Sequence, residues 1–144
     1  MSKLGFSVAV SVVSLGAAVG AWYYKYQLYG WLPSTASSEL KNVDGLLMDK
    51  EGKPFTGRVK DISDSGYSLY AYKDGKLDGL NVVFSEGQLR EIGHWENGEQ
   101  NGLFEAWTDK GVLVDHGIFK DGERDGETVQ YWPDTGKLKV KAQY

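Results

Sequence analysis

The chain has 144 residues, no cysteine and a net charge of −4 at pH 7, from 16 basic and 20 acidic residues. Without cysteine it has no disulfide framework, no thiol chemistry and no lipid-modified cysteine anchor. All 20 acidic residues follow residue 38, together with 14 of the basic ones, so this part carries −6. That charge argues against nucleic acid and anionic lipid as partners, and is compatible with a cationic protein partner.

The chain opens with an apolar run, Leu4 to Tyr24, that contains no charged residue. At 1.5 Å per residue, a helix of this length reaches about 30 Å, which is the thickness of the hydrocarbon core of a bilayer. We therefore predict a single transmembrane helix within residues 1–31. Aromatic residues follow it as a membrane-interface belt: Trp22, Tyr23, Tyr24, Tyr26, Tyr29 and Trp31.

Two further features of this segment concern its packing against another helix and its possible cleavage. Gly16 and Gly20 form a small-xxx-small pair that suits close packing against another helix, although chance in a Gly- and Ala-rich span explains it equally simply. A cleaved secretory signal is the alternative to a retained anchor, with Ala18-Val19-Gly20 as the small-x-small cleavage site. We favour retention in a bacterial inner membrane. The lack of Lys and Arg between Tyr26 and Glu39 favours a periplasmic carboxyl-terminal domain.

Residues 32–44 are predicted to be a linker, because Pro33 and a run of small polar residues end the helix. Beyond it, one eight-residue formula occurs three times, at Tyr72–Gly79, Trp95–Gly102 and Phe119–Gly126. It reads aromatic, charged, Asp or Asn, Gly, two variable residues, Asp or Asn, Gly. The glycines recur at offsets of 23 and 24 residues, which indicates a repeat architecture.

Asp-Gly and Asn-Gly between β-branched and aromatic residues predict β-hairpins. A second glycine turn follows in each repeat (Gly87, Gly111, Gly136), then a leucine two residues later (Leu89, Leu113, Leu138). Gly93, Gly117 and Ala142 precede the next aromatic by two residues and predict close packing there. An earlier, degenerate copy begins near Gly52–Gly57. We predict a mainly β domain over 45–144, an elongated antiparallel sheet with two strands per repeat, from one degenerate and three clear repeats.

The run Trp95-Glu-Asn-Gly-Glu-Gln-Asn-Gly102-Leu-Phe resembles a MORN repeat, and residues 45–144 resemble the variant MORN class of bacterial proteins described as antitoxin-like. Ordinary MORN repeats carry Gly-x-Gly after the second turn, whereas Gly79 here is followed by Leu-Asn and Gly102 by Leu-Phe. This departure places the chain with the variant class and weakens any transfer of lipid binding. The resemblance implies a scaffold, a membrane-contact module or a toxin-neutralising protein.

Residues that carry chemistry are few. His94 and His116 fall at non-equivalent repeat positions, and no third ligand has a metal-site spacing. The acidic residues of the turns are explained by turn geometry rather than by a calcium loop: Asp74, Asp78, Asp121 and Asp125. No nucleophile elbow, phosphate loop or dinucleotide fingerprint is present. We predict no enzymatic activity, no cofactor, no metal and no small-molecule substrate.

The end of the chain holds the candidate partner-binding residues. Tyr131 and Trp132 are adjacent, and adjacent strand residues point to opposite faces unless the strand bulges. Lys137, Lys139 and Lys141 alternate with apolar residues and are predicted to share one face of the terminal edge strand. Protection of the edge against further strand pairing explains these lysines, and a basic stripe for an acidic partner or for lipid headgroups near the membrane is the functional alternative.

These observations predict a membrane-anchored module that binds another protein. It acts either as an accessory or assembly subunit of a larger membrane complex, or as an antitoxin or immunity protein that covers a toxin. A lipid-contact role comes third, because the domain is acidic.

Overall fold

The computed structural model describes Tyr26 and residues 29–144. Within these residues the protein is mainly β, as predicted, with one short 3-10 helix, η1 (Ser37–Glu39). The strands are β1 (Thr35–Ala36), β2 (Lys41–Val43), β3 (Leu46–Met48), β4 (Gly57–Ser63), β5 (Gly66–Lys73), β6 (Lys76–Leu77), β7 (Gly79–Ser85), β8 (Gln88–Glu96), β9 (Glu99–Trp107), β10 (Leu113–Lys120), β11 (Glu123–Tyr131) and β12 (Leu138–Gln143).

The predicted transmembrane span lies outside the described residues. Gly16, Gly20, Trp22, Tyr23 and Tyr24 lie outside them too. In the part of the chain that the structure does describe, no helix has the length and apolar character needed to cross a bilayer.

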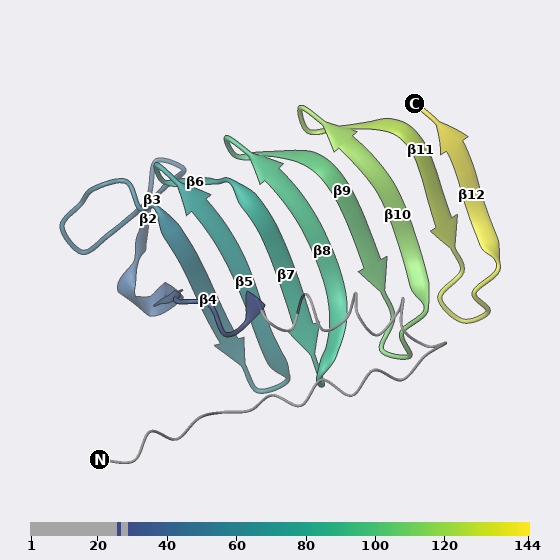
Figure 1. Cartoon of the computed structure of the whole chain (residues 1–144), viewed down its shortest axis with the longest axis horizontal. Helices are drawn as coiled ribbons and strands as arrows, with labels where there is room; N and C mark the ends of the chain where they lie inside the picture. The colour runs from purple at the N-terminus through teal and green to yellow at the C-terminus, as the bar shows by residue number, and fades with distance from the viewer. Residues whose placement is uncertain (1–25, 27–28) are drawn as a thin grey trace, which may run out of the picture.

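Hairpin-linked strands form one ten-stranded sheet in the order β1-β4-β5-β7-β8-β9-β10-β11-β12, with β6 paired to β5 (Figure 1). The long strands pair antiparallel, as predicted. One pair differs: β1 runs parallel to β4, through Thr35 with Val59 and Ala36 with Lys60. The hairpin β2–β3 forms a separate two-stranded sheet between these two strands in the chain. The sheet is therefore mixed, although mostly antiparallel.

The Asx-Gly turns adopt the conformation that the hairpin prediction requires. Both central residues have positive φ, for example 50° at Asp74 and 81° at Gly75, as a type I′ turn demands. The glycine of each turn also donates its N–H to a carbonyl of the preceding repeat. These bonds join Gly75 to Phe55 (2.8 Å), Gly98 to Leu77 (2.8 Å) and Gly122 to Gln100 (3.0 Å). The turns consequently lie in a row at one end of the strands (Figure 1).

The second glycine of the formula lies in a strand rather than in the turn. Gly79 is paired with Trp95 and Gly102 with Phe119. Gly126 exchanges two backbone hydrogen bonds with Tyr144, of 3.0 and 3.1 Å. In the degenerate copy Gly57 is paired with Tyr72 in the same way. Each repeat thus places an aromatic residue opposite a glycine of the preceding strand.

A bulge follows the leucine of every repeat. Phe84 is paired with Leu89 and Val83 with Glu91, so Arg90 is an extra residue in the ladder. The same shift makes Val114 extra in β10 and Lys139 extra in β12. Because a bulge resets the alternation of side chains, residues on its two sides face differently from what strict alternation predicts.

The two faces of the sheet differ in packing. We call core face the side that carries one cross-strand row: Leu69, Val82, Ile92, Glu105, His116 and Val129. Tyr26 packs on its first half and is 3% exposed, within a buried cluster that includes Leu69, Val82, Phe84 and Ile92. Lys60 Nζ donates to the Gly30 carbonyl at 3.1 Å, which holds Gly30 near this face.

The opposite side, here called the glycine face, carries the small residues predicted to allow close packing. Gly93, Phe104, Gly117, Thr128 and Ala142 form its cross-strand row. A Cβ on Gly93 would lie 3.3 Å from Trp95 Nε1. The prediction of close packing at Gly93 is therefore confirmed.

We expect Ile92→Ala to lower the free energy of unfolding by about 2–5 kcal/mol, because Ile92 is fully buried and its truncation leaves a cavity. Urea denaturation of the full chain in detergent measures this. Ile62→Ala removes the same atoms at a position that is 74% exposed and should change the value by less than about 0.5 kcal/mol. Equal losses in the two variants would contradict this location of the core.

Gly122→Ala should cost about 1–2 kcal/mol, because φ at Gly122 is 82° and a left-handed conformation disfavours a Cβ. No atom lies within 4 Å of that added Cβ, so the cost is conformational rather than steric. Gly122→Asn should lose less, since asparagine tolerates this conformation better than alanine. The same denaturation experiment compares them, and an asparagine variant as unstable as the alanine variant would argue against the type I′ turn.

Candidate functional site

The last strand of the sheet carries the candidate partner-binding residues. We call terminal edge the strand β12 together with Trp132, Lys137 and Tyr144. Among the described residues, β12 pairs with β11 alone and ends the strand order. Eight large hydrophobic side chains are exposed in the described part, and four of them belong to the terminal edge: Trp132 (50%), Leu138 (56%), Val140 (37%) and Tyr144 (64%).

Trp132 and Tyr131 have different environments, as their adjacency predicts. Tyr131 is half-buried and paired with Leu138. Trp132 begins the β11–β12 loop, where its N–H donates to the Lys137 carbonyl at 2.8 Å. The Nζ of Lys139 lies 4.9 Å from the centre of the Trp132 ring, within cation–π distance. The ring therefore combines an exposed apolar surface with a neighbouring positive charge.

The three lysines do not form the regular stripe that alternation predicts. Lys139 is the extra residue of the bulge, so Leu138 is opposite Tyr131 whereas Val140 is opposite Gln130. Lys137 lies outside the strand, at the end of the loop. Lys141 forms an exposed ion pair with Glu127 at 2.8 Å. The hydrogen bond with Glu127, and then its charge, raise the pKa of Lys141 above its ordinary value.

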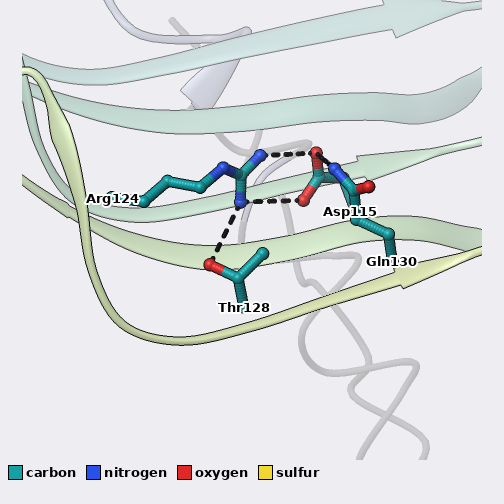
Figure 2. Close-up of polar contacts among 4 residues, drawn as sticks. All are labelled: Asp115, Arg124, Thr128 and Gln130. Atoms are coloured by element: carbon teal, nitrogen blue, oxygen red, sulfur yellow. Dashed lines mark hydrogen bonds and ion pairs between the residues drawn. The ribbon is translucent and has the colours of Figure 1, made fainter. Parts of the chain in front are cut away.

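A polar network on the glycine face links β10 with β11, the strand that pairs with β12 (Figure 2). The Arg124 guanidinium donates to both carboxylate oxygens of Asp115, at 3.2 and 2.7 Å. Arg124 also donates to Thr128 Oγ1 at 3.3 Å, and Gln130 Nε2 donates to Asp115 at 3.1 Å. Bidentate geometry and partial burial make this ion pair stronger than an exposed one.

The small residue of the repeat at position 117 leaves space for the Arg124 side chain. A Cβ on Gly117 would lie 2.6 Å from the guanidinium, so the glycine leaves room for it. The guanidinium carbon lies 4.9 Å from the centre of the Phe119 ring. Arg124 is paired with the aromatic residue of its own repeat, Phe119. The equivalent residues of the other clear repeats are paired in the same way, Gln100 with Trp95 and Leu77 with Tyr72.

Neither this network nor a partly buried pair on the core face was predicted from the sequence. His116 Nδ1 lies 2.8 Å from Glu105 Oε1, and Glu105 Oε2 is buried without a hydrogen-bond partner among the described residues. Burial, and then the charges of Glu105 and Tyr29, raise the pKa of Tyr26 above its ordinary value. The available signal was Glu105 itself, a carboxylate at an alternate position of the otherwise apolar run from Leu103 to Trp107.

The histidines lie on the core face of strands that β9 separates. His94 Nδ1 lies 3.2 Å from the Leu103 carbonyl, and His116 contacts Glu105. Within the described residues, no three His, Asp or Glu side chains come close enough to hold a metal ion.

The acidic residues of the turns have structural roles. Asp78 accepts a hydrogen bond from the Asn97 N–H at 3.2 Å, which links successive turns. Asp74 and Asp121 occupy the first left-handed position of their turns.

The residues predicted at a membrane interface differ in exposure. The ring of Tyr26 is packed in the core of the sheet and Tyr29 is half-buried beside it, with 6.4 Å between the two ring centres. Trp31 is 89% exposed. Tyr26 and Tyr29 pack over β5, β7 and β8, away from the terminal edge in the strand order.

No protein-family model, no curated protein and no solved structure matches this chain.

Arg124→Ala should lower the free energy of unfolding by about 1–3 kcal/mol, because it leaves the largely buried Asp115 carboxylate without its charged partner. Lys141→Ala breaks an exposed pair and should leave the midpoint of urea denaturation nearly unchanged. In a double-mutant cycle, Asp115→Ala should cost less in the Arg124→Ala background than alone. Additive losses measured by urea denaturation would show that the two side chains are not coupled.

Proposed function

We propose that this chain is a non-enzymatic, membrane-anchored module for protein–protein interaction, and that it serves as an accessory or assembly subunit of a larger membrane complex. The single observation that supports this function best is the terminal edge, where four large apolar side chains are exposed, Leu138 on one face and Val140 on the other: Trp132, Leu138, Val140 and Tyr144. Half of the large hydrophobic side chains exposed in the described part thus lie at this edge, and a concentration of exposed apolar residues is typical of an interaction site. Tryptophan and tyrosine are also the residue types that most often dominate binding energy at protein interfaces.

The membrane anchor in this proposal rests on the sequence of Leu4 to Tyr24, which is long and apolar enough to span a bilayer. The connector after it is short, so an anchored sheet stays close to the membrane surface. The sheet itself is a single layer, and the buried cluster under Tyr26 lies on β5, β7 and β8, with Leu103 and Trp107 of β9 packed against it. Such a layer offers little volume for an active site shielded from water, and much surface for a partner.

The resemblance of residues 45–144 to the variant MORN class supports a second candidate function. In this function the chain is an antitoxin or immunity protein that neutralises a toxin by covering it. The sheet would then act without a membrane complex. Deletion of residues 4–24 separates the two functions. An accessory subunit held through its helix loses its complex on deletion, whereas an inhibitor still binds its toxin.

Affinity purification of the full-length protein from its native membranes in mild detergent, followed by mass spectrometry, tests the proposed function. We expect a stoichiometric set of integral membrane proteins. Recovery of a lone soluble effector, encoded next to this chain, would replace the accessory-subunit role by the immunity role. Recovery of the chain by itself under both conditions would contradict both.

The double variant Trp132→Ala with Leu138→Ala should reduce the recovered partner about tenfold, because it removes exposed anchors of the interface. Ile62→Ala is the matched control, an exposed aliphatic residue of β4 near the other end of the sheet, and it should leave recovery unchanged. Circular dichroism should show the same fold in both. Equal recovery with all three proteins would exclude the terminal edge as the binding surface.

A further inference from the structure

The two edges of the sheet are protected differently. At the first edge β1 pairs with β4 through Val59 and Lys60, and Ser37 Oγ donates to Asp61 Oδ1 at 2.9 Å. Residues 35–39 thus cover much of that edge. At the other edge, no strand of the described chain pairs with the outer side of β12. A strand edge of this kind is a template for an additional strand.

The hydrogen bonds of β12 show which backbone groups face outward. Tyr144 exchanges both of its backbone hydrogen bonds with Gly126, so its N–H and C=O point toward β11. Because these groups alternate along an antiparallel strand, those of Lys141 and Gln143 point away from β11. The repeat agrees with this. The residues equivalent to Lys141 are Ile92 and His116, which are paired with Glu105 and Val129 of the following strand.

The charge of this edge selects the kind of strand that fits. Lys137, Lys139 and Lys141 lie within five residues, and no acidic residue follows Asp134. Lys141 already holds Glu127, but both side chains are more than half exposed, so a competing carboxylate replaces that contact at little cost. Antiparallel pairing with a second copy would bring lysines opposite lysines, which is unfavourable. A basic segment would be repelled for the same reason.

We propose that β12 binds an acidic, extended segment of a partner protein as an additional antiparallel strand. This inference rests on the proposed function and specifies its binding mode. Carboxylates of the segment meet the ammonium groups of Lys139 and Lys141, and apolar residues that face the same way as Val140 extend its surface. The backbone of Lys141 and Gln143 supplies the hydrogen bonds that pair the two strands, whatever the sequence of the segment.

The test uses the full-length chain in detergent and two short capped peptides, one that alternates glutamate with valine and one that alternates lysine with valine. Isothermal titration calorimetry measures binding. We expect the glutamate peptide to bind at least about tenfold more tightly than the lysine peptide. The double variant Lys139→Glu with Lys141→Glu should reverse this preference.

Gln143→Pro tests the strand pairing itself, because proline removes the outward N–H and leaves the bonds between β11 and β12 in place. It should weaken binding of the glutamate peptide about tenfold, while the matched variant Gln143→Ala should bind like the wild type. Circular dichroism checks that both variants are folded. Failure of the glutamate peptide to bind, equal binding of the two peptides, or full binding by Gln143→Pro would each overturn the inference.

Light scattering tests whether a second copy of the chain, rather than an acidic segment, pairs with the outer side of β12. A dimer that Gln143→Pro dissociates would assign the edge to self-association and overturn the inference. The proposed function is tested separately by the purified partner. If Gln143→Pro still recovers that partner, the strand-pairing mode is wrong and the interaction function stands. If the wild-type chain recovers no partner but binds the glutamate peptide, the proposed function is wrong and the strand-pairing mode stands.

Discussion

The backbone hydrogen bonds between consecutive Asx-Gly turns are the constraint on which the rest of the structure depends. Each turn needs two successive residues with positive φ, which Asp or Asn followed by glycine accepts at low cost. The N–H of that glycine then reaches a carbonyl of the preceding repeat, as Gly98 reaches Leu77. This bond sets the offset between hairpins, and the offset places each aromatic residue opposite a glycine, as Trp95 lies opposite Gly79. A one-residue slip would move every side chain to the other face.

Given that register, the sheet is stabilised by different interactions along its length. Its first half has a buried apolar cluster, closed by Tyr26 over Leu69, Val82 and Ile92. Further along, the core-face row changes to Glu105 and His116, and the glycine face carries the ion pair of Arg124 with Asp115. The hydrophobic contribution therefore falls toward the last strands, and polar contacts that require specific geometry replace it. This gradient leaves the exposed apolar residues at the terminal edge.

The functional proposal follows from that gradient. A sheet that shields its first edge with β1 and holds its core under Tyr26 presents its last strand to other molecules. Lysines on β12 discourage pairing with further copies of the chain, which permits an unpaired edge to persist without aggregation. The same lysines give this edge a positive charge, whereas the part of the chain after residue 38 carries a net charge of −6. Protection against self-association and selection of an acidic partner are then two results of the same side chains.

Local features of the sequence were enough to predict the hairpins, the edge position of the last strand and the close packing at Gly93, because turn chemistry and alternation act over a few residues. The sequence also indicated that Tyr131 and Trp132 have different environments, since adjacent strand residues point to opposite faces. It did not predict the bulge at Lys139, the parallel pairing of β1 with β4 or the position of Tyr26 in the core. Nor did it predict the pairs of Arg124 with Asp115 and His116 with Glu105. Each of these depends on strands brought together across the sheet, so only the tertiary structure decided them.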